Sequence, residues 1–161
     1  MVLYNRLISI RNHLLEAESN IDVQLKRRYD LIPNLVSVAK NYGVYEKTTL
    51  KEIVEMRSQN RELVDSDNQR KVSQSLRSLL LLVEKYPEIK ADESYENLFN
   101  QLVDVEDDIQ MTRRYFNGTV RELNTKIESF PNILVAGLLG FQEAKFLEFD
   151  VATQKVNFDV A

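Results

Sequence analysis

The chain has 161 residues, of which 43% are hydrophobic and 29% are charged, and its formal net charge is −4 at pH 7. This composition is typical of one folded domain, and a chain of this length buries roughly 68–70% of its unfolded surface. The acidic balance argues against broad nucleic-acid binding, because such binding needs a basic face that displaces phosphate counterions. The absence of cysteine excludes disulfides and thiolate chemistry.

Helix-breaking residues are scarce, with four glycines and three prolines in the whole chain, which favours long helices and few turns. The first helix is predicted from about Tyr4 to Arg28, where apolar residues recur at helical spacing. Its stripe consists of Leu7, Ile10, Leu14, Ala17, Ile21 and Leu25. No Ser, Thr or Asp N-cap precedes it, so a natural terminus with a frayed first turn and an upstream truncation both stay open. No apolar run reaches the ~20 residues that cross a bilayer.

The stretch from Ile21 to Val36 holds the densest basic cluster of the chain. Its charged and aromatic members are Lys26, Arg27, Arg28, Tyr29 and Asp30. We predict a turn here, with Asp30 capping a second helix and Pro33 in its first turn, where the missing N–H costs nothing. The alternative is one continuous, proline-kinked helix of nearly 55 residues. Such a helix would be ~82 Å long, which looks too long to bury its apolar face within this chain.

The second predicted helix carries its apolar face through Leu35, Val38, Tyr42, Tyr45, Thr49, Ile53 and Met56. A polar region from Ser58 to Asn68 then predicts a turn. The third helix follows, with Val72, Leu76, Leu79, Val83 and Tyr86 on its apolar face. It is expected to end at Tyr86, because the residue before a proline avoids the α region.

The fourth helix is predicted to start between Ala91 and Ser94, with Asp92 or Ser94 as its cap, and to stop at Pro131. Its stripe consists of Tyr95, Leu98, Leu102, Val105, Ile109, Phe116, Val120, Leu123 and Ile127. The fold class is therefore all-α, with four long antiparallel helices in an up-and-down bundle crossing at about 20°. Residues 1–130 form the bundle of a single domain, and residues 131–161 form an apolar cap and tail that pack on it or trail from it.

The first and fourth helices are expected to be antiparallel neighbours. Aligning their stripes pairs Leu7 with Ile127 and places Arg28 level with Glu106. The same register places Asp22 near Arg113 and Arg114. An interhelical ladder of ion pairs is one interpretation of this register. The other is two solvated charged faces that never meet, in which each ion pair contributes about 0–1 kcal/mol.

The segment from Phe130 to Phe141, FPNILVAGLLGF, is almost wholly apolar. Its large side chains include Phe130, Leu134, Leu138, Leu139 and Phe141. It is too short to span a bilayer, so it is either a cap folded over the base of the bundle or an interfacial segment that touches lipid or a partner. From Phe146 to Ala161 the pattern alternates, which indicates a strand-like ordered tail or a loose terminus.

Catalytic and metal-binding patterns are missing from the sequence. Its single histidine, His13, cannot supply the paired Glu-x-x-His motifs of a di-iron bundle, and His-based zinc sites draw on several ligands. Neither a Gly-rich phosphate loop nor a Gly-x-Ser-x-Gly elbow occurs. We therefore expect no enzyme activity, no cofactor and no metal. The polar candidates for burial are Asn5, Gln24, Arg28 and Asn117, in roles that fix helix register.

The run IDVQLKRRYDLIPNLV, from Ile21 to Val36, resembles the signature of the LemA family. Matching motifs flank it in the right order: Tyr4-Asn5 with Leu7, Tyr86-Pro87 with Ala91, Arg113-Arg114 with Phe116-Asn117, Asn124, Phe130-Pro131, Ala136 and Gly140-Phe141. The resemblance covers nearly the whole chain. The chain departs from the family at Tyr45-Glu46, where His-Glu is common, at Phe116, where Tyr is common, and in lacking a hydrophobic N-terminal segment.

The resemblance implies a helical bundle that is the soluble portion of a bacterial membrane protein, held by a single transmembrane anchor before Tyr4. It supplies no enzyme activity. One hypothesis is a non-catalytic, membrane-tethered scaffold that binds a membrane-associated protein through residues 26–30. The other is a lipid-surface or membrane-organising module that uses Phe130 to Phe141. A homo-oligomer through Tyr42, Tyr45 and Phe99 is a further possibility.

Overall fold

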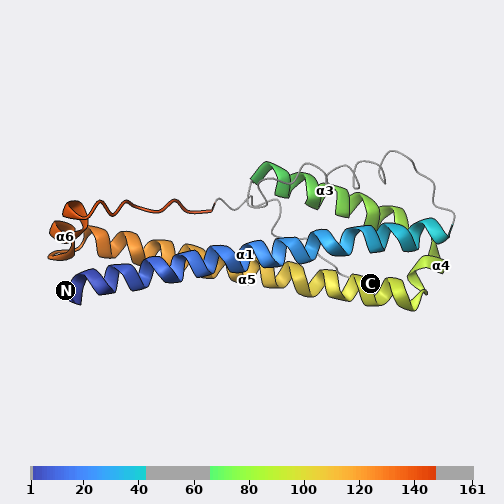
Figure 1. Ribbon diagram of the computed structural model, residues 1–161. Coiled ribbons are helices and arrows are strands. Elements are labelled where there is room, and N and C mark those ends of the chain that lie inside the picture. Colours follow the sequence, from blue (N-terminus) through green and yellow to red (C-terminus); the bar gives the residue numbers. More distant parts are fainter. Residues whose placement is uncertain (1, 43–65, 148–161) are drawn as a thin grey trace. The chain divides into compact units, whose positions relative to one another are not determined.

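A computed structural model of the chain describes residues 2–42 and 66–147, and all regular secondary structure within them is α-helical (Figure 1). The all-α prediction is therefore confirmed for this part of the chain. The helices are α1 (Val2–Asn41), α3 (Ser66–Val83), α4 (Pro87–Lys90), α5 (Glu93–Glu128) and α6 (Asn132–Leu138). The described residues divide into two compact units. We call residues 2–23 with 108–147 the α6 unit, and residues 24–42 with 66–107 the α3 unit.

The predicted turn at residues 28–33 is wrong, because α1 continues through it as one helix of 40 residues with Pro33 inside. Asp30 is exposed and lies within this helix, so it caps nothing. An internal proline costs about 3 kcal/mol. Around it, five side chains are buried: Tyr29, Ile32, Leu35, Val36 and Ala39. Burying a large apolar side chain contributes about 1.5–3 kcal/mol, so packing outweighs the local cost of the proline.

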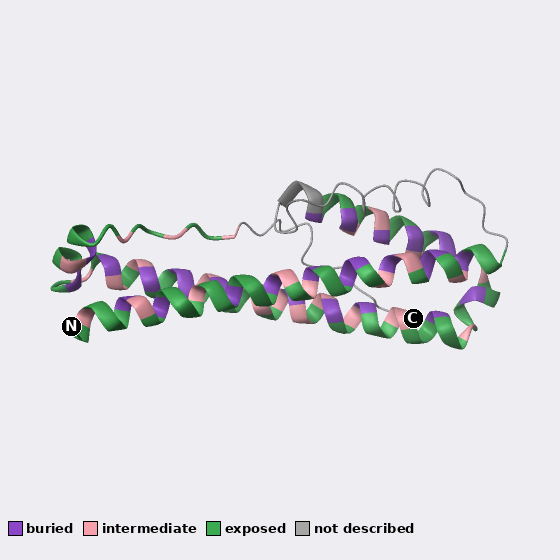
Figure 2. Cartoon of the chain, viewed as in Figure 1, coloured by how far each residue is buried: buried purple, intermediate pink, exposed green. Residues whose placement is uncertain are grey.

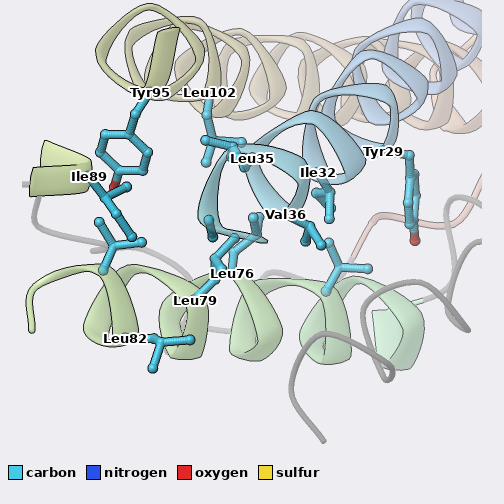
Figure 3. Packing of buried hydrophobic residues seen from close by; sticks show 13 residues of the cluster. Tyr29, Ile32, Leu35, Val36, Leu76, Leu79, Leu82, Ile89, Tyr95 and Leu102 are labelled. Carbon is cyan, nitrogen blue, oxygen red and sulfur yellow. The ribbon is translucent and has the colours of Figure 1, made fainter. Parts of the chain in front are cut away.

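The core of the α3 unit joins four helices. Figure 3 shows side chains from α1, α3, α4 and α5 converging, with Leu35 of α1 beside Leu102 of α5. Leu79 of α3 and Ile89 of α4 are 1% and 0% exposed. Because α4 is a single turn, the burial of Ile89 is what fixes it to the unit.

The short link between α3 and α5 follows its sequence signals closely. α3 ends at Val83, and Pro87 opens α4 in the first helical position, where it displaces no hydrogen bond. Asp92 caps α5, as predicted: its Oδ1 accepts hydrogen bonds from the N–H groups of Ser94 (2.8 Å) and Tyr95 (3.1 Å). Its Oδ2 accepts one from the Tyr42 hydroxyl at 2.6 Å, which ties the end of α1 to the start of α5.

The α6 unit has a smaller apolar cluster. Leu7 and Ile10 of α1, Leu123 and Ile127 of α5 and Ala136 of α6 are buried in it. Leu7 and Ile127 thus belong to one cluster, in agreement with the predicted register. The peptide bond before Pro131 is cis, and α6 begins at the next residue.

After α6 the chain reverses and runs back as an extended segment, residues 141–147, which we call the strap (Figure 1). Gly140 makes the reversal at φ 69°, a left-handed conformation that favours glycine. The N–H of Phe141 donates to the carbonyl of Ala136 at 3.0 Å, which is the 6→1 bond of a Schellman motif. Hydrogen bonds from Asn117 and Asn124 of α5 hold the strap at Leu147 and Ala144.

Several predictions fall outside the described residues. They include most of the second helix, from Gly43 onward, and the strand-like tail from residue 148. The predicted polar turn is described only at its end, where α3 already begins at Ser66. The division into a bundle over residues 1–130 and a cap over 131–161 stays a prediction.

Candidate functional site

The signature stretch places a buried cation in the α3 unit. Arg28 of α1 is 1% exposed, and its Nη1 donates to Glu106 Oε1 of α5 at 2.9 Å. Its Nη2 donates to Gln69 Oε1 of α3. Its Nε is buried and finds no partner among the residues that the structure describes. Three helices therefore meet in one charged node, which we call the Arg28 node.

The geometry of the Arg28 node matters more than its net energy. Tyr29 is next in the chain and 9% exposed. Burial raises the pKa of its hydroxyl above the ordinary value, and the positive charge of Arg28 opposes that rise. A buried ion pair gains little over an apolar replacement, but breaking it leaves an uncompensated charge. The node thus penalises any register of α1, α3 and α5 that separates the three side chains.

The predicted interaction cluster at residues 26–30 is split by burial. Lys26, Arg27 and Asp30 are exposed, whereas Arg28 and Tyr29 are buried. Arg27 Nη1 donates to Gln24 one turn back at 3.0 Å. The five residues therefore do not form one accessible surface, because α1 is a helix here and two of them face its core. Binding of a partner through them stays a prediction.

The predicted ladder is found at one rung in the α3 unit, where Arg28 meets Glu106. The other rung lies in the α6 unit. There Asp22 of α1 and Arg113 of α5 are half-buried, and Arg114 is exposed. Pairing of Asp22 with either arginine stays a prediction.

The end of the α6 unit exposes apolar side chains. Asn132 and Ala136 are buried and fix α6, but most of its surface is open to solvent (Figure 2). Of the predicted membrane-proximal residues, Phe141 is half-buried and the other four are exposed. Their exposed fractions are Phe130 82%, Leu134 68%, Leu138 87% and Leu139 48%. With Ile133, which is 49% exposed, they form what we call the apolar end.

The predicted oligomer face has two described members, and both have contacts within the α3 unit. Tyr42 donates to Asp92, and Phe99 stacks on Tyr95 with ring centroids 6.1 Å apart. The bond to Asp92 raises the pKa of Tyr42 and lowers that of Asp92. Tyr45 lies outside the described residues. Tyr42 and Phe99 thus stabilise their own unit.

Some functional contacts were missed from the sequence. Gln69 directly follows the predicted polar turn (Ser58 to Asn68), and nothing in its neighbourhood marks it as a partner of a buried arginine. The sequence did contain a signal for the strap contacts, namely two asparagines, Asn117 and Asn124, seven residues apart on one face of a helix. Asn5 is exposed, against expectation, because it lies outside the apolar stripe of α1. His13 is exposed on α1.

In the described ranges 2–42 and 66–147, no three His, Asp or Glu side chains are placed to hold a metal ion. What the arrangement offers is a helical bundle with a buried ion pair and an exposed apolar end.

The family model described as "LemA family" matches residues 17–160. The chain belongs to the LemA family.

Similar proteins carry two kinds of name. The magnetosome protein MamQ of Magnetospirillum gryphiswaldense is 22% identical over 89% of this chain and 64% of its own length. The magnetosome protein MamQ 2 of Paramagnetospirillum magneticum is also 22% identical, over 90% and 64%. The protein LemA of Metamycoplasma hominis is 28% identical over 94% and 74%. The chain thus spans less than two thirds of the length of the MamQ relatives.

Proposed function

We propose that this chain is a non-catalytic scaffold domain that works at a membrane, with the apolar end of the α6 unit toward the bilayer. The observation that carries the proposal is the sidedness of α6. Asn132 and Ala136 fix the helix to its unit, while Leu134 and Leu138 are 68% and 87% exposed. Contiguous exposed apolar side chains mark sites that meet lipid or a partner.

The N-terminus of α1 lies in the same unit and supports this orientation. Leu7 and Ile10 pack in the cluster that holds Ala136, so the first turns of α1 lie beside α6. Val2 is 81% exposed and Tyr4 43%. A single-pass anchor joined before Tyr4 would place the apolar end against the bilayer. None of the described helices is itself long and apolar enough to cross one.

A vesicle-binding experiment tests the membrane contact directly. The full chain is sedimented with phosphatidylcholine vesicles, with and without phosphatidylglycerol. The net charge of −4 gives no attraction to anionic lipid, so we expect binding to depend on apolar burial. Leu134→Glu with Leu138→Glu is expected to weaken vesicle binding by at least about tenfold, because burying each leucine contributes about 1.5–3 kcal/mol.

Matched controls separate the apolar end from surface leucines in general. Leu15 of α1 is 55% exposed and Leu81 of α3 56%, so a double change to Glu there removes a similar apolar area. That control should bind vesicles like the parent chain. Equal binding by all three proteins would reject the apolar end as the membrane contact.

The scaffold role needs a protein partner, and the exposed basic residues are the candidate contact. Lys26 and Arg27 are exposed on α1 in the α3 unit. We expect Lys26→Glu with Arg27→Glu to remove partners captured by photo-cross-linking in native membranes. If the capture pattern is unchanged while the apolar-end variant loses vesicle binding, the second candidate, a lipid-surface or membrane-organising module, is favoured.

A further inference from the structure

The strap is held by a pair of asparagines that contact its main chain. Asn124 Nδ2 donates to the carbonyl of Ala144 at 3.0 Å, and Asn124 Oδ1 accepts from the N–H of the same residue at 2.9 Å. Asn117 repeats the arrangement at Leu147, at 3.1 and 2.9 Å. Each amide side chain therefore pairs with both polar groups of one strap residue, as a neighbouring strand would.

The spacing of the two asparagines matches an extended chain. Seven residues of α-helix advance about 10.5 Å and return to almost the same face. Three residues of an extended or polyproline-type chain advance about 9–10 Å. Two helical turns of α5 are thus as long as the three-residue step from Ala144 to Leu147. The match lets both amides pair in full without distorting either segment.

Burial along the strap follows the same three-residue step. Phe141, Ala144 and Leu147 are half-buried, and the four residues between them are exposed. The Arg11 guanidinium of α1 lies 5.8 Å from the centre of the Phe141 ring, a cation–π contact that fixes the first position. The sequence pattern that fits this face of α5 is therefore Phe-x-x-Ala-x-x-Leu. The backbone N–H and C=O groups of its Ala and Leu positions pair with the two asparagines.

The strap is only partly buried. None of its seven residues is fully buried. It is attached by four hydrogen bonds to Asn117 and Asn124, by the contact of Phe141 with Arg11, and by packing of Phe141 and Ala144 against the apolar cluster of the α6 unit. It starts directly after Gly140, where the left-handed turn gives the chain a natural hinge. When it leaves, Asn117 and Asn124 can be satisfied by water, because both are half-buried.

From these observations we propose that Asn117 and Asn124 form a receptor for an extended peptide backbone, and that its partner in trans is the strap of a second copy of this chain. The strap of a second copy has the same sequence, so it would offer the same N–H and C=O groups at Ala144 and Leu147. Exchange of an identical element between protomers is a low-cost route to a dimer. The proposal is independent of the proposed membrane contact and adds a way for copies to join.

Two complementary full-length variants test the exchange in solution, without lipid. Asn117→Ala with Asn124→Ala keeps the strap and loses the receptor. Ala144→Pro with Leu147→Pro keeps the receptor and removes the two strap N–H donors. Neither variant should dimerise alone. A 1:1 mixture should contain a heterodimer by light scattering, with hydrogen-exchange protection restored at Ala144 and Leu147 of the first variant.

Matched controls use neighbouring positions. Asn97→Ala with Asn100→Ala removes two exposed asparagines of α5, and Gln142→Pro with Lys145→Pro changes exposed strap residues whose N–H groups the amides do not use. Both controls should keep protection at Ala144 and Leu147. A mixture of the complementary variants that stays monomeric, with both amides unprotected, would overturn exchange with a second copy.

A peptide experiment keeps the test valid even if the asparagine variant does not fold. The peptide FQEAKFL is added to the Ala144→Pro/Leu147→Pro chain, whose helices are unchanged. It should bind, and N-methylation at its Ala and Leu should weaken binding at least tenfold. Equal affinity of the methylated peptide would show that the backbone is not recognised and would reject the receptor. Loss of this binding would leave the vesicle results untouched.

Discussion

The α3 unit and the α6 unit depart from the usual distribution of side chains in opposite directions. The α3 unit, which also holds a large apolar cluster, buries a charge: Arg28 is 1% exposed. The α6 unit exposes apolar groups, because Leu138 is 87% exposed beside a small cluster. A buried ion pair specifies which helices meet, and an exposed leucine has no such use within its own unit. Under the proposed function, the buried ion pair gives the α3 unit specificity of folding, and the exposed leucines give the α6 unit its surface toward the membrane.

The largest effect is expected from removing the counter-ion of the Arg28 node. Glu106→Ala leaves the guanidinium buried beside the Gln69 amide, its other partner among the described residues. We expect a loss of about 3–5 kcal/mol in the free energy of unfolding by urea. The double change Arg28→Met with Glu106→Leu should recover most of it, because no buried charge remains. If the single change costs under about 1 kcal/mol, the node does not hold the α3 unit in register.

A pair of identical truncations compares the two units directly. Leu79→Ala empties a core position that is 1% exposed, and we expect it to destabilise the protein by about 2–5 kcal/mol. Leu138→Ala changes a side chain that is 87% exposed and should stay within about 0.5 kcal/mol. Urea unfolding measures both. A large loss for Leu138→Ala would mean that the apolar end is covered within the protein.

The smallest effect concerns Asp92, which links α1 and α5 of the α3 unit. The hydrogen bond from Tyr42 and the backbone bonds at the start of α5 lower its pKa. The folded-state pKa is thus below the unfolded value of about 3.9, and its stabilisation is present above that pH and lost as the pH falls through the folded pKa.

We therefore expect Asp92→Asn to lower the urea midpoint at pH 7. The difference from the parent should narrow as the pH falls below about 4. Asp104→Asn, an exposed site in the same helix, serves as the control. A difference that stays constant down to pH 2.5 would mean that the charge of Asp92 contributes nothing.

The sequence predicts α5 well, because its signals are local and agree with one another. Asp92 is an N-cap, the apolar stripe has helical spacing, and Pro131 follows the last turn. The register between α1 and α5 was also accessible, since the two stripes determine which residues stand level. The contact of Arg28 with Glu106 follows that register.

Local signals could not decide whether the chain turns at Pro33 or continues as one helix. Asp30 and Pro33 have the right types for a cap and a first turn, yet the burial of Ile32, Leu35 and Val36 on both sides decides for a continuous helix. Which side of α6 is buried and which is exposed could not be predicted from the sequence either. Its apolar pattern left a buried cap and an interfacial segment open as alternatives, and the structure combines features of the two, with Ala136 buried and Leu138 exposed.

A strap that is recognised through its main chain has a consequence for how this sequence can change over generations. The four exposed residues between Phe141 and Leu147 contribute no hydrogen bond to the two asparagines. Substitutions there can therefore change charge and size without displacing the strap. Asn117 and Asn124 have no such latitude, since even aspartate would lose the donor. Mutations should therefore accumulate in the strap and spare the helix that holds it.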